Sequence, residues 1–122
     1  MKTIISGLFI LLVQISFGVG GSELTSIQVF EQKNTLRIID VRTPEEFNGP
    51  EGHIKGAKLV TLGPELSDFL LAGNHKERIV FVCRSGKRSA KAVEESLRLG
   101  YEVVFSMKGG MLDWKAQGLP TE

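Results

Sequence analysis

Four short apolar runs alternate along the chain with segments that carry helix signals. The runs are LRIIDV (36–41), AKLV (57–60), RIVFVC (78–83) and EVVFSM (102–107), and such runs are typical of strands covered on both faces. Helices are expected within 22–34, 43–47, 64–73, 89–100 and 109–118. Strands separated by helices predict an α/β fold, in which right-handed crossovers build a central parallel β-sheet with helices on both faces.

The ends and faces of these helices can be predicted from single residues. Thr43, followed by proline and then by Glu46, forms a capping box. Ser22 or Thr25 is expected to cap the first helix. The side chains expected to pack from the last two helices are Ala90, Ala92, Val93, Leu97, Leu99, Met111, Leu112 and Trp114.

The first 21 residues differ in composition from this pattern. Lys2 precedes an apolar run over 4–17, and small residues follow at Gly18, Gly20 and Gly21. This order predicts a cleaved signal peptide over 1–21 and a mature domain over 22–122, periplasmic or secreted. A retained membrane anchor and a buried N-terminal helix are the alternatives, although the apolar run is shorter than the ~20 residues that span a bilayer.

Charge and cysteine content narrow the function classes. The chain has 15 basic and 14 acidic residues, and removal of 1–21 would take away only Lys2. This balance gives no support for a nucleic-acid partner, and a membrane contact is expected only if the N-terminal segment is retained. Cys83 is the only cysteine, so an exported chain would carry an unpaired thiol that has to be buried or used.

Cys83 ends an apolar strand and begins the cationic stretch CRSGKRSAKA. A loop over 84–87 with a helix starting near Arg88 or Ser89 would direct backbone N–H groups inward and form an anion site. Gly86 would allow the tight reversal. Helix N-termini and nearby cations favour the thiolate form of a cysteine, so we expect an activated nucleophile at the carboxyl edge of the sheet, where ligands bind in such folds.

Three motifs in order resemble those of the single-domain rhodanese (thiosulfate sulfurtransferase-like) family. They are IIDVRTPEEFNGPEGHIKGA, VFVCRSGKRSAKA and MKGGMLDWKAQGLP, and the similarity covers about 24–119. The resemblance implies a rhodanese-like domain that transfers sulfur through a persulfide on Cys83. The residues that it implies for binding the anionic donor and the persulfide are Arg84, Ser85, Gly86, Lys87 and Arg88. It implies no metal and no organic cofactor.

The partners implied by this resemblance are a small anionic sulfur donor, such as thiosulfate, and a cyanide or thiol acceptor. A protein sulfur donor or acceptor remains an alternative, in which the domain is a persulfide carrier. A phosphatase or arsenate reductase is less favoured, because related phosphatases place five residues between cysteine and arginine, whereas four separate Cys83 from Arg88. A non-catalytic domain is disfavoured because the thiol and its cations are present.

Three further residues near strand ends or turns are weaker candidates. Asp40 and Arg42 follow a predicted strand and are candidates for the edge of the pocket, although a structural ion pair is the favoured interpretation. His53 lies in a glycine-rich segment, where a structural hydrogen bond is favoured over proton transfer.

Overall fold

The computed structural model describes residues 22–122, so the predicted signal peptide over 1–21 lies outside the described residues. The elements of this part are β1 (Ser22–Leu24), α2 (Ser26–Gln32), β2 (Arg37–Asp40), α3 (Pro44–Phe47), β3 (Lys58–Leu59), α4 (Pro64–Ala72), β4 (Arg78–Val82), α5 (Lys87–Arg98), β5 (Val103–Met107) and α6 (Gly110–Ala116). Within this range, no helix has the length and apolar character needed to cross a bilayer.

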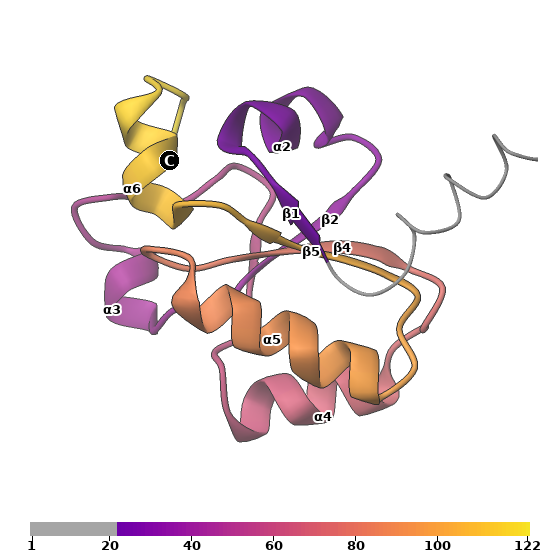
Figure 1. Ribbon diagram of the computed structural model, residues 1–122. Helices are drawn as coiled ribbons and strands as arrows, with labels where there is room; N and C mark the ends of the chain where they lie inside the picture. Colours follow the sequence, from indigo (N-terminus) through magenta and orange to yellow (C-terminus); the bar gives the residue numbers. More distant parts are fainter. Residues whose placement is uncertain (1–21) are drawn as a thin grey trace, which may run out of the picture.

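The five strands form one parallel sheet in the order β1-β5-β4-β2-β3. Helices α4 and α5 cover one face, and α2 and α6 cover the other (Figure 1). Strand β4 is central, pairing with β2 on one side and β5 on the other. The predicted α/β architecture is therefore confirmed, and the residue that follows β4 lies at the middle of the carboxyl edge of the sheet.

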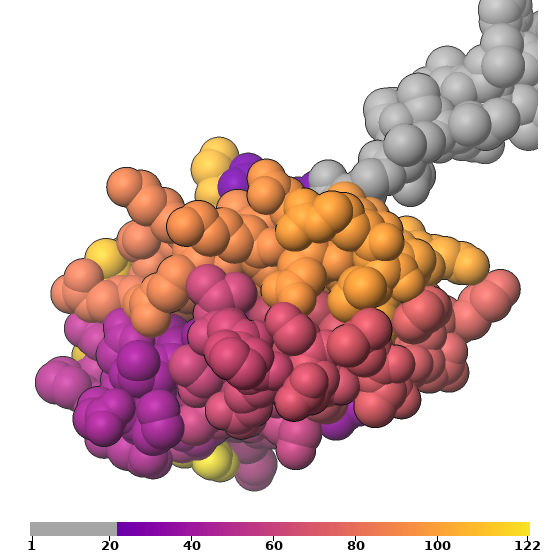
Figure 2. Space-filling view, turned by 90° about the horizontal axis from the view of Figure 1, so that it is seen from below, coloured from indigo at the N-terminus to yellow at the C-terminus, as the bar shows by residue number. Residues whose placement is uncertain are grey.

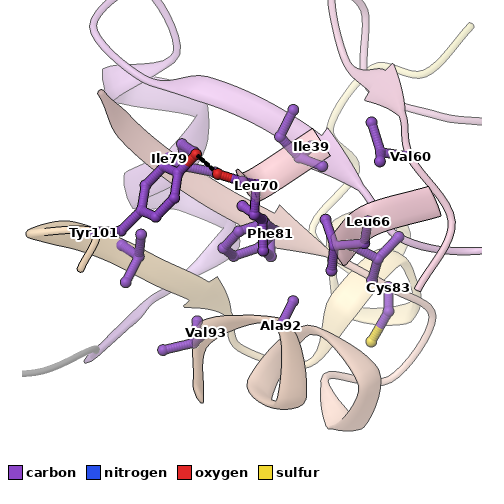
Figure 3. Packing of buried hydrophobic residues seen from close by; sticks show 12 residues of the cluster. Ile39, Val60, Leu66, Leu70, Ile79, Phe81, Cys83, Ala92, Val93 and Tyr101 are labelled. Carbon is purple, nitrogen blue, oxygen red and sulfur yellow. Dashed lines mark hydrogen bonds between the residues drawn. The ribbon is translucent and has the colours of Figure 1, made fainter. Parts of the chain in front are cut away.

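Each face of the sheet has its own hydrophobic cluster. Ile39, Phe81 and Ala92 belong to the cluster under α4 and α5, and Val80 and Trp114 to the one under α2 and α6. Figure 3 shows the first cluster, with Cys83 at its edge and the sulfur directed away from Leu66. The space-filling view of this face shows α4 and α5 lying side by side, with α3 at one end (Figure 2).

Several predicted helix features are confirmed at the level of individual hydrogen bonds. Thr43 caps α3 through its side chain, and the Glu46 side chain returns a bond to the Thr43 backbone N–H. Strand β1 was not predicted, because its residues 22–24 stand at the start of the segment in which the first helix was expected. Of the two expected caps, Thr25 is the one that the structure uses.

Two predicted packing residues are exposed instead. Ala90 faces solvent, and the side chains that α5 buries completely or nearly so are those of Ser89, Ala92, Val93 and Ser96. Leu112 is 42% exposed, whereas Met111 and Trp114 are buried as expected. The apolar pattern found Ala92 and Val93 on the buried face of α5 but missed Ser89 and Ser96, which are polar and each have a hydrogen-bond partner.

Candidate active site

The loop between β4 and α5 begins at Cys83 and closes within a few residues. Strand β4 ends at Val82, and α5 begins at Lys87, slightly earlier than expected, with Gly86 as its N-cap residue. Gly86 has φ of 108°, a conformation that residues with a side chain rarely adopt. The short reversal returns the start of α5 over Cys83.

The sulfur of Cys83 lies beneath this reversal and accepts two backbone hydrogen bonds. The N–H of Gly86 donates to Sγ at 3.0 Å, and the N–H of Ser89 donates to it at 3.3 Å. The thiol in turn donates to Ser89 Oγ at 3.5 Å. Cys83 is 1% exposed, and a buried sulfur anion is tolerable only with such donors.

Further loop amides remain available for an anion. Within residues 22–122, the backbone N–H groups of Arg84, Ser85, Lys87 and Arg88 have no hydrogen-bond partner. The carbonyl groups of Cys83 and Arg84 accept bonds from Met111 and Leu112 at the start of α6, at 2.9 and 3.1 Å. Because a trans peptide directs N–H and C=O oppositely, the amides of Arg84 and Ser85 point away from α6. We call residues 83–89 the sulfur loop.

The three cations of the sulfur loop differ in their surroundings. Arg88 forms a bidentate ion pair with Glu46 of α3, with both contacts at 2.8 Å. Arg84 is half exposed and lies 3.6 Å from Glu51. Lys87 is exposed and makes no ion pair within the described part of the chain. The structure therefore leaves Lys87 and, in part, Arg84 available to an incoming anion, whereas Arg88 already has an anionic partner.

The ion pair between Arg88 and Glu46 changes the titration of both groups. The hydrogen bonds from Arg88 lower the pKa of Glu46 from 4.5 to about 2, against the opposing effect of partial burial. The hydrogen bonds to Glu46 raise the pKa of Arg88, to which the charge of Cys83 adds a smaller effect. Both side chains are thus charged throughout the physiological range.

Comparison with known proteins identifies the family. The profile of the rhodanese-like domain matches residues 26–117. The chain belongs to the rhodanese-like family. Thiosulfate sulfurtransferase 16, a chloroplastic protein of Arabidopsis thaliana, is 33% identical over 97 residues, covering 70% of this chain and 79% of the relative. The putative sulfur carrier protein YrkF of Bacillus subtilis is 33% identical over 93 residues, covering 73% and 49%.

Solved structures agree with this assignment. A rhodanese-like domain protein from Staphylococcus aureus superimposes with a TM-score of 0.67 at 32% identity, covering 83% of this chain and 98% of that one. The chain spans about half the length of two of its curated relatives, at 52% and 49%. Sulfur transfer is the activity named for several members of this family.

Asp40 and Arg42 of this rhodanese-like domain form a buried ion pair. Neither residue has accessible surface, and the Arg42 guanidinium also donates to the backbone carbonyls of Glu46 and Gly52. The pair thereby ties the end of β2 to α3 and the following turn. Both side chains are buried and support the segment that carries Glu46.

Three residues of this candidate site were not predicted as site residues from the sequence. Glu46 was assigned only to a helix cap, Ser89 only to the expected start of a helix, and Ser106 to no role. Ser106 of β5 lies 2.7 Å from Ser89 through their hydroxyl oxygens. The spacing of three residues between Ser89 and Ala92, which places both on one face of the helix, was the available signal for Ser89; no sequence signal distinguished Ser106.

His53 has a structural environment in this domain. Its Nδ1 lies 2.9 Å from the carbonyl oxygen of Phe47, and its ring stacks on that of Phe47 with centroids 3.7 Å apart. Its Nε2 lies 3.5 Å from Glu122. Among residues 22–122, no cluster of three or more histidine, cysteine, aspartate or glutamate side chains is placed to hold a metal ion.

Proposed function

We propose that this protein moves a sulfane sulfur from thiosulfate or a related donor to cyanide or a thiol through a persulfide on Cys83. The observation that carries the proposal is the hydrogen bonding of Cys83 Sγ by the amides of Gly86 and Ser89 within a loop whose other amides are unpartnered. These donors stabilise negative charge on sulfur before the reaction and on the persulfide after it.

The chemistry balances without an added oxidant or reductant. The Cys83 thiolate attacks the sulfane sulfur of thiosulfate, the S–S bond of the donor breaks, and sulfite leaves with the electron pair. Cyanide or a thiolate then attacks the outer sulfur of the persulfide. The bond between the two sulfurs breaks, and its electron pair returns to Sγ as the thiolate.

The dimensions of the loop support sulfur as the electrophile. Four residues separate Cys83 from Arg88, and the sulfur is 1% exposed beneath the loop. A single terminal sulfur atom occupies less space than a tetrahedral phosphate group, whose oxygens need hydrogen-bond donors on several sides. Arg84 and Lys87, at the exposed rim, would attract the anionic donor.

Turnover and intact mass test this proposal together. The full chain should produce thiocyanate from thiosulfate and cyanide, and after thiosulfate alone its mass should increase by about 32 Da, an increase that reduction removes. Cys83→Ser should abolish both signals. Equal inactivity of the wild type and Cys83→Ser toward several sulfane donors, with no mass increase in either, would overturn the proposal.

A second candidate, a persulfide carrier that exchanges sulfur with a partner protein, is favoured by the name of the Bacillus relative, a putative sulfur carrier protein. A carrier should acquire one sulfur from a protein persulfide donor much faster than from thiosulfate. We would measure both rates by intact mass. A faster reaction with thiosulfate would favour the enzyme.

Export is part of the proposal. The order of charge, apolar run and small residues over 1–21 supports a signal peptide and a periplasmic or secreted domain. An unpaired cysteine in such a compartment is consistent with a thiol that is both shielded and used.

A further inference from the structure

Two buried hydroxyl groups connect Cys83 with strand β5. Ser89 is fully buried in the first turn of α5, and Ser106 is 4% exposed on β5. Their oxygens are 2.7 Å apart, and Ser89 Oγ also lies 3.1 Å from the Gly86 carbonyl oxygen and 3.5 Å from Cys83 Sγ. The side chain of Ser106 therefore reaches the sulfur only through Ser89.

The donor count of a hydroxyl restricts how this network is arranged. Ser89 has one O–H donor and two acceptor lone pairs. With Cys83 as a thiol, Ser89 donates to Gly86 and accepts from both Cys83 and Ser106. With Cys83 as a thiolate, the sulfur has no proton to donate, and the Ser89 O–H can rotate toward Sγ while Ser106 continues to donate to Ser89 Oγ. A hydroxyl that accepts one hydrogen bond is a stronger donor in the next.

We propose that Ser89 and Ser106 are positioning residues that stabilise the thiolate of Cys83, Ser89 by donating its hydroxyl proton to Sγ and Ser106 by holding Ser89 in that role. The inference deepens the proposed function, because it concerns the readiness of the same nucleophile. Its test below requires no sulfur donor.

Charged groups on the neighbouring elements also act on this thiol, and the test leaves all of them unchanged. Arg88 interacts electrostatically with both Cys83 and Asp40. The charged side chains of the sulfur loop and of the elements around it, including the wall beside Ser106, include Arg84, Lys87, Arg88, Lys91, Lys108, Asp40, Arg42, Glu46, Glu51, Asp113, Glu23, Glu94 and Glu95. Replacing a serine by alanine alters no charge in this set.

The composition of the chain makes a direct titration feasible. Cys83 is the only cysteine and Tyr101 the only tyrosine, so thiolate absorbance in the ultraviolet reports on Cys83 alone once tyrosine is accounted for. Burial raises the pKa of Tyr101, which moves phenolate absorbance away from the thiolate range. Cys83→Ser supplies the blank.

We expect the midpoint of this titration to rise by about one pH unit in Ser89→Ala, the size expected for one hydrogen bond to a charged group. The backbone N–H of Ser89 still donates to the sulfur, so the change isolates the hydroxyl. Ser106→Ala should give a smaller rise. The double variant should shift no further than Ser89→Ala, because Ser106 acts only through Ser89.

Ser96→Ala is the matched control. Ser96 is buried on the same helix and donates to the Val93 carbonyl oxygen, and its loss should leave the midpoint unchanged. Ser106 also borders a surface pocket of about 250 Å³, which leaves room for a methyl group. Ser106→Thr should therefore retain the wild-type midpoint, and Ser106→Val, of the same shape without the hydroxyl, should raise it.

Two results would overturn the proposed roles of Ser89 and Ser106. One is that the wild type, Ser89→Ala and Ser106→Val titrate at the same midpoint. The other is that the shifts of the two alanine variants add in the double variant. If an alanine variant does not fold, the comparison of Ser106→Thr with Ser106→Val still tests the proposal, because β-branched residues are well tolerated in a strand. The outcome is separable from the proposed function. A shifted midpoint in the serine variants without thiocyanate production by the wild type would refute turnover and support the roles of Ser89 and Ser106. Thiocyanate production with an unshifted midpoint would support turnover and refute those roles.

Discussion

Arg88 and Glu46 face each other edge to edge, with Nη1 to Oε1 and Nη2 to Oε2 both at 2.8 Å. The contact joins the first turn of α5 to α3, and the start of α5 lies near α3 in Figure 1. Glu46 also caps α3 by bonding the Thr43 N–H. The Glu46 carboxylate thus caps the start of α3 and also holds the Arg88 guanidinium in place.

Glu46→Gln should make the free energy of unfolding less dependent on pH in the acid range. The pKa of Glu46 is lowered in the folded state from 4.5 to about 2, so its stabilisation is complete above pH 4.5 and is lost as the pH falls toward 2. Urea unfolding at several pH values should show a smaller loss over this window in Glu46→Gln. Glu45→Gln, next to it and exposed, should follow the wild type; identical profiles for all three proteins would contradict the expectation.

Lys87→Gln should weaken capture of thiosulfate without slowing the chemical step. Lys87 is exposed at the rim of the sulfur loop, and one screened surface charge accounts for roughly a two- to fivefold rise in KM. The effect should diminish as salt is added. Lys76→Gln, at the opposite edge of the sheet before β4, is the control. A loss confined to kcat would argue against a capture role.

Gly110→Ala should destabilise the fold and misplace the sulfur loop. A Cβ there would overlap the carbonyl groups of Arg84 and Cys83, and φ is 60°. We expect a loss above about 3 kcal/mol in the free energy of unfolding. Gly118→Ala has φ of 73° with nothing within 4 Å of its Cβ, so it should cost only about 1–2 kcal/mol. Equal melting temperatures for the two variants would refute the close approach.

Asp40→Ala should strongly destabilise the folded protein, because Asp40 belongs to a buried ion pair. The substitution leaves the Arg42 guanidinium buried without its carboxylate, which costs about 3–5 kcal/mol in other buried pairs. Glu77→Gln, in the exposed pair with Arg37, should cost below about 1 kcal/mol. Denaturant unfolding measures both, and a small effect of Asp40→Ala would show that water reaches Arg42.

Export can be tested at the amino terminus of the protein recovered from its native host. Sequencing should show a start just after Gly18, Gly20 or Gly21. Any of these sites keeps Ser22 and the pairing of β1 with β5. A protein that retains Met1 or Lys2 would contradict cleavage and favour the anchor.

Local signals predicted much of the fold because they act over a few residues. The capping box at Thr43 and the strand before Cys83 depend on neighbours in sequence, and both formed as expected. Strand β1 was missed because three residues beside a capped helix have no alternation to detect, and only pairing with β5 defines them. Ser89 was missed as a core residue because a pattern of apolar residues does not include a serine, even where the serine is buried.

The sequence by itself determined the α/β alternation, the position of Cys83 at the end of an apolar strand and the spacing of four residues between Cys83 and Arg88, because each is a property of contiguous chain. Only the tertiary structure decided that Arg88 binds Glu46, 42 residues away, and that Ser106 contacts Ser89, 17 residues away. Such contacts depend on strand order and helix placement, which bring distant residues to one edge of the sheet. The candidate nucleophile, Cys83, could therefore be identified from the sequence, whereas the contacts between Arg88 and Glu46 and between Ser89 and Ser106 could not.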